Sequence, residues 1–228
     1  MVVVVTGCSR GIGFGLIKLL SNTHKVYCVS RNIDSIKELK SQISSPENLS
    51  YFQGDICKLN KKNIDDWIKE DSVDVLINNA GLLINKPFLS QTYDDYKSVF
   101  DVNLFGTINM TQLLVDKLIN SSNGQVLNIG SIGGVQGSSK YPGLSVYSSS
   151  KAAVSILTEC LALELKEFNI KVNCLALGAV QTEMLNDAFP GYRAQVSVDQ
   201  MSEYILNFIS NGSLLTNGQI IPVNLSNP

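Results

Sequence analysis

Residues 2–13, which read VVVVTGCSRGIG, decide the fold of this chain. Four consecutive valines are typical of a strand that is covered on both faces. The glycines at positions 7, 11 and 13 permit a tight turn in which backbone N–H groups can approach an anion closely. Helical periodicity begins at residue 11, and the positive end of a helix dipole favours that anion. The stretch therefore predicts a strand, a phosphate-binding turn and a helix in succession.

The alternation of strand and helix continues along the whole chain. Short apolar runs predict strands at Val2–Val5, Lys25–Ser30, Leu49–Gln53, Val73–Asn78, Gln125–Ile129, Lys171–Leu175 and Gln219–Val223. Helices are expected near residues 11–21, 34–43, 60–70, 93–120, 146–168 and 198–210. Such alternation predicts an α/β fold of the Rossmann type: a doubly wound, seven-stranded parallel sheet in the order 3-2-1-4-5-6-7, in a three-layer α/β/α arrangement. Serine clusters at 44–45, 121–122 and 148–150 fall at expected helix ends, where serine favours capping.

Length and composition set limits on the class of protein. The chain has 228 residues and no linker-like segment, so one domain over residues 1–228 is expected. Its net charge of −2 gives no reason to expect a nucleic-acid partner. No window approaches the roughly 20 apolar residues of a membrane span, and Met1 runs into the valines without a basic leader. We therefore expect a cytoplasmic protein.

Cysteine and histidine usage excludes two kinds of site. The five cysteines are scattered, and none forms a Cys-x-x-Cys pair, which argues against a zinc site or a disulfide framework and suits a reducing compartment. The single histidine, His24, leaves no ordinary Ser-His-Asp triad and is expected on a surface loop.

Two residues carry the expected chemistry. Tyr147 and Lys151 are four residues apart near the start of a helix, so their side chains share one helix face. An adjacent ammonium can lower the pKa of a tyrosine by about 1–3 units. The pair is therefore expected to donate or accept a proton near neutral pH.

Further motifs follow in order and make the chain resemble a short-chain dehydrogenase/reductase from Val2 to Asn224. They are Thr6-Gly-Cys-Ser-Arg-Gly-Ile-Gly13, Asn78-Asn79-Ala80-Gly81, Asn103-Leu-Phe-Gly106, Ser131, Tyr147-x-x-x-Lys151 and Asn217-Gly-Gln219. The resemblance implies an NADP(H)-dependent enzyme that moves a hydride between the nicotinamide and a carbonyl or alcohol.

The resemblance also implies a role for each catalytic residue. Ser131 would hold the substrate oxygen, and Tyr147 would pass it a proton. Lys151 would hold the nicotinamide ribose and lower the pKa of Tyr147. Asn103 would distort its helix and help to hold a water molecule that returns the proton through Lys151. Thr182 would contact the carboxamide of the nicotinamide.

The implied cofactor-binding set extends over the whole carboxyl edge of the sheet. Its members are Gly7, Ser9, Arg10, Gly11, Ile12, Gly13, Ser30, Arg31, Asp55, Ile56, Asn79, Ala80, Gly81, Tyr147, Lys151, Gly178, Val180 and Thr182. Asp55 either lies near the adenine or caps the helix that follows it. The substrate pocket is expected to be partly apolar, with Tyr141, Met184, Leu185, Phe189 and Tyr192 in its wall.

The end of the second strand favours NADP(H) as the cofactor, with NAD(H) as the alternative. Ser30 stands where NAD-preferring relatives usually carry an aspartate, and Arg31 follows it. A 2′-phosphate needs cations there, and Arg10 is the second expected contact. Asp34 would repel the phosphate, but it is interpreted as a helix cap.

Several features depart from the family pattern or leave alternatives open. Leu177-Gly178 replaces the usual Pro-Gly, the interval from Ser131 to Tyr147 is long, and the covering segment of residues 183–197 is short, which predicts a mobile lid and an open mouth. A catalytically idle NADP(H)-binding scaffold or redox sensor is the alternative function.

The helices near 93–120 and 146–168 are expected to pair into a homodimer or homotetramer. The apolar residues expected to make this contact include Val99, Leu104, Ile108, Leu114, Ile156, Leu157 and Leu161.

Overall fold

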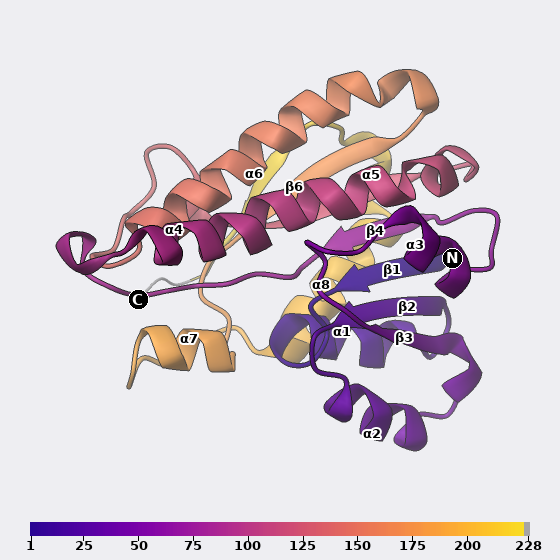
Figure 1. The fold of residues 1–228 in the computed structure, drawn as a ribbon, viewed down its shortest axis with the longest axis horizontal. Helices are drawn as coiled ribbons and strands as arrows, with labels where there is room; N and C mark the ends of the chain where they lie inside the picture. The colour runs from indigo at the N-terminus through magenta and orange to yellow at the C-terminus, as the bar shows by residue number, and fades with distance from the viewer. Residues whose placement is uncertain (226–228) are drawn as a thin grey trace.

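A parallel sheet of seven strands forms the centre of the molecule, in the order β3-β2-β1-β4-β5-β6-β7 (Figure 1). The computed structural model describes residues 1–225. The strands are β1 (Val2–Thr6), β2 (Lys25–Ser30), β3 (Leu49–Gln53), β4 (Val75–Asn78), β5 (Gln125–Ser131), β6 (Lys171–Leu177) and β7 (Ile220–Val223). The predicted class, strand order and parallel pairing are confirmed.

Helices cover both faces of this sheet. They are α1 (Gly11–Leu20), α2 (Asp34–Gln42), α3 (Lys61–Trp67), α4 (Tyr93–Phe100), α5 (Gly106–Ile119), α6 (Ser145–Glu164), α7 (Glu183–Ala188) and α8 (Val198–Ser210). The valines of β1 alternate between two cores: Val3 and Val5 pack in the cluster that holds Leu16 of α1 and Ile205 of α8, whereas Val4 packs with Leu114 of α5. This two-sided burial explains why β1 is an unbroken apolar run.

The element bounds differ from the sequence expectations in informative ways. β5 and β6 extend to Ser131 and Leu177, so both strands run further toward the site than predicted. The expected helix at 93–120 is α4 and α5 joined by a π-helical turn at Asp101–Phe105. α6 ends at Glu164 and is followed by a short 3₁₀ turn at Lys166–Phe168, which ends at Asn169 in a left-handed conformation with φ of 58°. The helix α7 was not predicted.

The serines at 148–150 do not cap a helix. α6 already begins at Ser145, and its N-cap residue Leu144 makes no side-chain cap hydrogen bond. Ser150 is buried inside the helix, where its hydroxyl donates to the Tyr147 carbonyl at 2.7 Å. The capping interpretation was therefore wrong at this cluster. Across residues 1–225, no helix has the length and apolar character needed to cross a membrane.

Candidate active site

The phosphate-binding turn between β1 and α1 is shaped by contacts that exclude a side chain. Gly7 has φ of 72°, and a Cβ atom there would lie 2.6 Å from the Ala80 Cα. A Cβ atom on Gly13 would lie 2.2 Å from the Gly7 carbonyl oxygen. No side chain caps the start of α1. The first N–H groups of this helix are therefore directed into the turn, which is the arrangement that a pyrophosphate needs.

Thr6 and Asn79 hold this turn against the end of β4. The Thr6 hydroxyl accepts hydrogen bonds from the backbone N–H groups of Asn79 at 3.1 Å and Ala80 at 3.0 Å. The Asn79 amide donates to the carbonyls of Thr6 and Gly7 at 3.0 and 2.9 Å. These bonds fix the floor on which an adenosine would lie.

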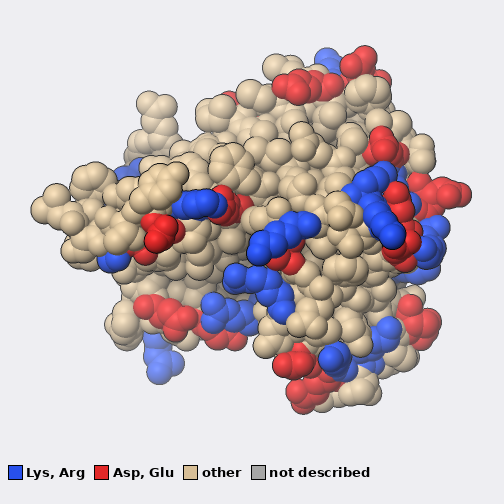
Figure 2. Space-filling view, in the orientation of Figure 1, with Lys and Arg blue, Asp and Glu red and all other residues tan. Residues whose placement is uncertain are grey.

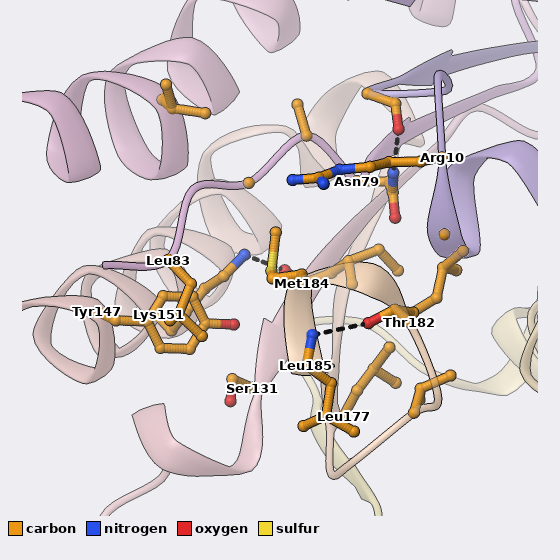
Figure 3. A pocket seen from close by; sticks show the side chains of 18 of the residues that line it. Arg10, Asn79, Leu83, Ser131, Tyr147, Lys151, Leu177, Thr182, Met184 and Leu185 are labelled. Carbon is orange, nitrogen blue, oxygen red and sulfur yellow. Dashed lines mark hydrogen bonds between the residues drawn. The ribbon is translucent and has the colours of Figure 1, made fainter. Parts of the chain in front are cut away.

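A cavity of about 490 Å³ runs from this turn to Tyr147 along the carboxyl edge of the sheet (Figure 3). Ligands of open α/β sheets bind at this edge, where the strand order reverses. Its wall contains the expected residues Gly7, Ser9, Arg10, Gly11, Ile12, Ser30, Arg31, Asp55, Ile56, Asn79, Ala80, Gly81, Ser131, Tyr141, Tyr147, Lys151, Gly178, Val180, Thr182, Met184, Leu185 and Phe189.

Three expected site residues do not line this cavity. Gly13 lies beneath the turn, where it allows α1 to pack against Gly7. Asn103 is buried behind the wall. Tyr192 is not among the lining residues, and its backbone N–H donates to the Phe189 carbonyl at 3.1 Å. Gly13 and Asn103 therefore affect the cavity only through the residues that they contact.

Tyr147 and Ser131 face the same part of the cavity from α6 and β5 (Figure 3). Burial raises the pKa of Tyr147, and a hydrogen bond with Ser131 opposes that rise. The Ser131 hydroxyl also accepts from the Gly133 N–H at 3.2 Å.

Lys151 is a buried cation at the base of the cavity. Its Nζ donates to the Ile129 carbonyl at 2.7 Å, and only 5% of the residue is exposed. Burial lowers the pKa of Lys151 to about 8, because the desolvated ammonium is less stable than the neutral amine. The proton on this group is therefore more easily removed than that of a surface lysine.

Asn103 sits in the π-helical turn and links the loop after β4 to α6. Its Oδ1 accepts from the Leu82 N–H at 2.7 Å, while its Nδ2 donates to the Leu82 carbonyl at 3.0 Å and to the Ser150 hydroxyl at 2.8 Å. The Thr107 hydroxyl donates to the Asn103 carbonyl at 2.9 Å. The side chain thus fixes the loop after β4 against α6, and Ser150 is a positioning residue that sequence analysis missed.

A buried polar chain ties α5 to α6 beneath the sheet. Asn78 donates to the hydroxyl of Thr111 on α5 at 3.2 Å and to Asn128 Oδ1 on β5 at 2.9 Å. Asn128 in turn donates to the hydroxyl of Thr158 on α6 at 2.9 Å. Since α6 carries Tyr147 and Lys151, this chain helps to set their depth relative to the sheet.

Two aspartates near the end of the cavity where the adenine is expected have different positions in the fold. Asp55 Oδ1 accepts from the Cys57 N–H at 3.0 Å and lines the cavity, whereas α3 is capped by Asn60. Asp34 is the first residue of α2 and not its cap, because Asn32 Oδ1 accepts the Asp34 N–H at 2.8 Å. Asp34 does not line the cavity, whose wall at the end of β2 is formed by Ser30, Arg31 and Asn32.

The substrate end of the cavity is mainly apolar. Met184 and Leu185 extend from α7, and the Tyr141 and Phe189 rings meet edge to face with centroids 5.9 Å apart. Sequence analysis missed further apolar wall residues, namely Leu83, Ile132, Leu144 and Leu177. Their positions at or after the carboxyl ends of β4, β5 and β6 were the available signal.

The covering segment is more ordered than a bare loop. Thr182 caps α7 by accepting the Leu185 N–H at 3.2 Å, and its own hydroxyl proton can point to a ligand. Ala188 is buried, and Asn85 Nδ2 donates to its carbonyl at 2.6 Å. A parallel bridge joins Val180 to Val196. A helix cap and a side-chain hydrogen bond therefore hold the part of the covering segment at residues 182–189.

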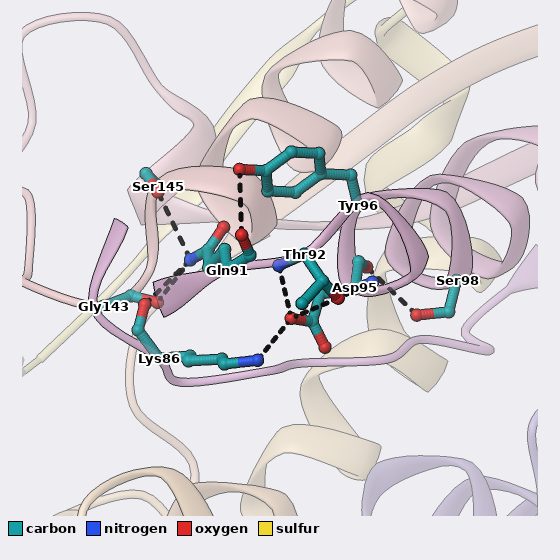
Figure 4. Close-up of polar contacts among 8 residues, drawn as sticks. All are labelled: Lys86, Gln91, Thr92, Asp95, Tyr96, Ser98, Gly143 and Ser145. Atoms are coloured by element: carbon teal, nitrogen blue, oxygen red, sulfur yellow. Dashed lines mark hydrogen bonds and ion pairs between the residues drawn. The ribbon is translucent and has the colours of Figure 1, made fainter. Parts of the chain in front are cut away.

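The loop after β4 also holds the start of α6 (Figure 4). Gln91 Nε2 donates to the Lys86 carbonyl at 2.8 Å and lies 3.5 Å from both the Gly143 carbonyl and the Ser145 hydroxyl. Lys86 pairs with Asp95 at 2.6 Å and lowers the pKa of that carboxyl to about 2. This cluster anchors the long interval between Ser131 and Tyr147.

Comparison with known proteins gives consistent matches. A family model described as short chain dehydrogenase matches residues 1–193. Carbonyl reductase family member 4 of Xenopus tropicalis is 35% identical over 190 residues, with 80% of this chain and 77% of that protein covered. An uncharacterized oxidoreductase of Staphylococcus epidermidis is 27% identical over 218 residues, or 93% of this chain and 92% of its own length.

Solved structures share the whole fold. The structure of ElxO with NADP bound superposes with a TM-score of 0.83 at 25% identity and covers 97% of this chain and 96% of its own. The 3-ketoacyl-(acyl-carrier-protein) reductase of Brucella melitensis, complexed with NADH, gives a TM-score of 0.83 at 23% identity over the same shares. At this identity, the second match establishes the fold alone.

Proposed function

Because this chain belongs to the short-chain dehydrogenase/reductase family, we propose that it is an NADP(H)-dependent oxidoreductase that interconverts a carbonyl and an alcohol, with Tyr147 as general acid and base. The observation that carries this proposal is the single cavity that joins the phosphate-binding turn to Ser131, Tyr147 and Lys151. Relatives with oxidoreductase names and a neighbour with bound NADP support it. We also propose that residues 1–228 form one domain and act in the cytoplasm.

The turn, the helix start and the polar wall fit the dinucleotide. Gly7 and Gly11 would admit the pyrophosphate, Asp55 and Ile56 would lie at the adenine, and Thr182 would hold the carboxamide. When bound, the nicotinamide supplies or accepts the hydride. The protein itself has to orient the substrate oxygen and move one proton.

Ser131 and Tyr147 perform these two tasks in the proposed reaction. The Ser131 hydroxyl donates to the substrate oxygen and fixes its distance from Tyr147. During reduction, the Tyr147 hydroxyl gives its proton to that oxygen; during oxidation, the phenolate takes it back. The Lys151 ammonium stabilises the phenolate and can return a proton to it, which its pKa of about 8 favours. The Ile129 carbonyl holds Lys151 in place.

The substrate end favours partly apolar ketones and aldehydes. Apolar side chains from Leu83, Leu144, Met184 and Phe189 surround the place where a carbonyl would meet Tyr147. A panel of alkyl and aryl carbonyls, assayed with NADPH by loss of reduced-cofactor absorbance, tests this function. The alternative, a catalytically idle scaffold or redox sensor, predicts NADPH binding with no turnover on any member of the panel.

NADPH is expected to be preferred over NADH by at least tenfold in kcat/KM, or about 1.4 kcal/mol. Arg31 and Arg10 both line the cavity, and no acidic side chain lines it at the end of β2, where Ser30, Arg31 and Asn32 form the wall. Two guanidinium groups on one 2′-phosphate make charge-assisted hydrogen bonds. The measurement is kcat/KM with both cofactors for the parent and Arg31→Ala, in which the preference should shrink. Equal use of both cofactors by the parent would contradict the assignment.

We propose that the protein forms a homodimer or homotetramer through α5 and α6. Val99 and Leu114, which were expected to contribute, are buried inside the protomer. Ile156 on α6, which was also expected to contribute, is exposed, as are Leu163 on α6 and Phe105 in the π-helical turn. Figure 2 shows few charged side chains over the middle of these helices. Light scattering at micromolar concentration should therefore give at least twice the protomer mass. A particle of 24.8 kDa would contradict this proposal.

A further inference from the structure

Arg10 reaches beyond the phosphate-binding turn to which it belongs. Its backbone is extended just before α1, and its side chain makes no cap hydrogen bond with that helix. The guanidinium extends across the cavity (Figure 3). It lines both the cofactor cavity and a smaller adjoining pocket of about 160 Å³. Arg10 therefore lies between the two pockets and can contact groups in either of them.

The partner of Arg10 is a carboxylate on the covering helix. Arg10 Nη1 lies 3.8 Å from Asp187 Oδ2, and 57% and 73% of the two side chains are exposed. Arg31, Asn85 and Asp187 line the same small pocket. The two arginines proposed to hold the 2′-phosphate thus share a pocket with an anionic side chain from α7.

We infer that Asp187 is a specificity-determining residue that competes with the cofactor 2′-phosphate for Arg10. In the free protein, the carboxylate pairs with the guanidinium. A 2′-phosphate carries more negative charge and can engage Arg10 together with Arg31, so it displaces Asp187. A cofactor without this phosphate has no group that can replace Asp187 as the partner of Arg10. This inference rests on the proposed NADP(H) preference.

The displacement also frees one of the polar contacts that hold α7. Besides the Arg10–Asp187 ion pair, the helix is held by the Asn85 amide on the Ala188 carbonyl and by the Gln181 amide on Asn186 Oδ1. An ion pair this exposed contributes little to stability. Its loss would therefore loosen α7 without unfolding it, and would do so when the 2′-phosphate binds. The covering helix would then open to substrate in response to the phosphorylated cofactor.

The test compares the parent with Asp187→Asn, using adenosine 2′,5′-bisphosphate and adenosine 5′-monophosphate as probes that lack the nicotinamide. Titration calorimetry at low salt should show about threefold tighter binding of the bisphosphate to the variant, or about 0.7 kcal/mol. Binding of the monophosphate should not change. Asp199→Asn changes the net charge equally at an exposed position on α8 that lines neither pocket, so both probes should bind it as they bind the parent.

Hydrogen exchange gives the second readout. In the parent, the bisphosphate should speed exchange of the Asn186 and Phe189 amides, which bond to the Thr182 and Leu185 carbonyls of α7, and the monophosphate should not. In Asp187→Asn, these amides should exchange faster before any probe is added.

The outcomes separate this inference from the proposed function. If the parent binds the two probes equally, the NADP(H) preference is wrong, and the inference is overturned with it. If the parent prefers the bisphosphate but Asp187→Asn binds both probes as the parent does, the preference stands and the competition by Asp187 is wrong. If Asp187→Asn binds both probes more tightly by the same factor, the gain comes from the change in net charge and not from the 2′-phosphate. That result would also overturn the inference.

Discussion

Tyr147→Phe is expected to lower kcat by about 10²- to 10⁴-fold, the range typical of a lost general acid or base. The substitution removes the hydroxyl that lies by Ser131 and leaves the ring in place at the wall of the cavity. Cofactor affinity should change by less than about threefold, because the phosphate-binding turn and Lys151 are untouched. Steady-state kinetics and a fluorescence titration with NADPH measure the two quantities.

The matched control is Tyr141→Phe, which removes a second hydroxyl from the same cavity. Tyr141 contributes its ring to the contact with Phe189, and it is assigned no proton transfer. Its kcat should stay within about fivefold of the parent. If Tyr147→Phe also stayed within a few-fold of the parent, the proposed proton transfer would be wrong.

Lys151→Ala is expected to damage both cofactor binding and turnover. The ammonium is the only cationic side chain in the wall near Tyr147, among the described residues that line the cavity. Its removal would weaken the proposed ribose contact and leave the Ile129 carbonyl without its donor. A rise in the NADPH Kd of about tenfold, together with a fall in kcat of at least about 10²-fold, follows from the loss of a charged hydrogen bond and of the proton relay.

The pH dependence gives Lys151 a second, independent signature. Since its pKa in the cofactor-free protein is about 8, the ammonium is present below that pH and is lost as the pH rises through it. NADPH affinity should therefore decline between about pH 7 and 9 in the parent. Titrations of Lys151→Ala over the same range should be flat near pH 8. A parent titration that is also flat would contradict the assigned charge state.

The strands could be predicted because each is marked locally, and their order follows from the doubly wound arrangement that the alternation predicts. β1, β4 and β6 are apolar on both faces, and the glycines at 7, 11 and 13 identify the turn after β1. Element ends were less accessible, since they depend on tertiary contacts. Side-chain contacts across the fold were equally inaccessible. The Lys151 ammonium was expected at the ribose, and the sequence did not predict that it also donates to the carbonyl of Ile129 near the end of β5.

The parts of the site that escaped prediction depend on partners distant in sequence. The side-chain partners of Asn103, which are Leu82 and Ser150, were not predicted, because they lie 21 and 47 residues away in the sequence. Asp187 carries no motif, and only the fold brings it to Arg10. Likewise, nothing in the short segment at 183–197 predicted that Asn85 and Thr182 hold α7 through hydrogen bonds.

Label transfer from the cofactor tests the central claim most directly. The purified protein is incubated with an excess of NADPH dideuterated at C4 of the nicotinamide and the panel of alkyl and aryl carbonyls, and the products are analysed by mass spectrometry. The account predicts an alcohol that carries one deuterium at its carbinol carbon, formed by the parent and nearly absent with Tyr147→Phe. Tight NADPH binding without transfer of label to any carbonyl would contradict it and would favour the idle scaffold.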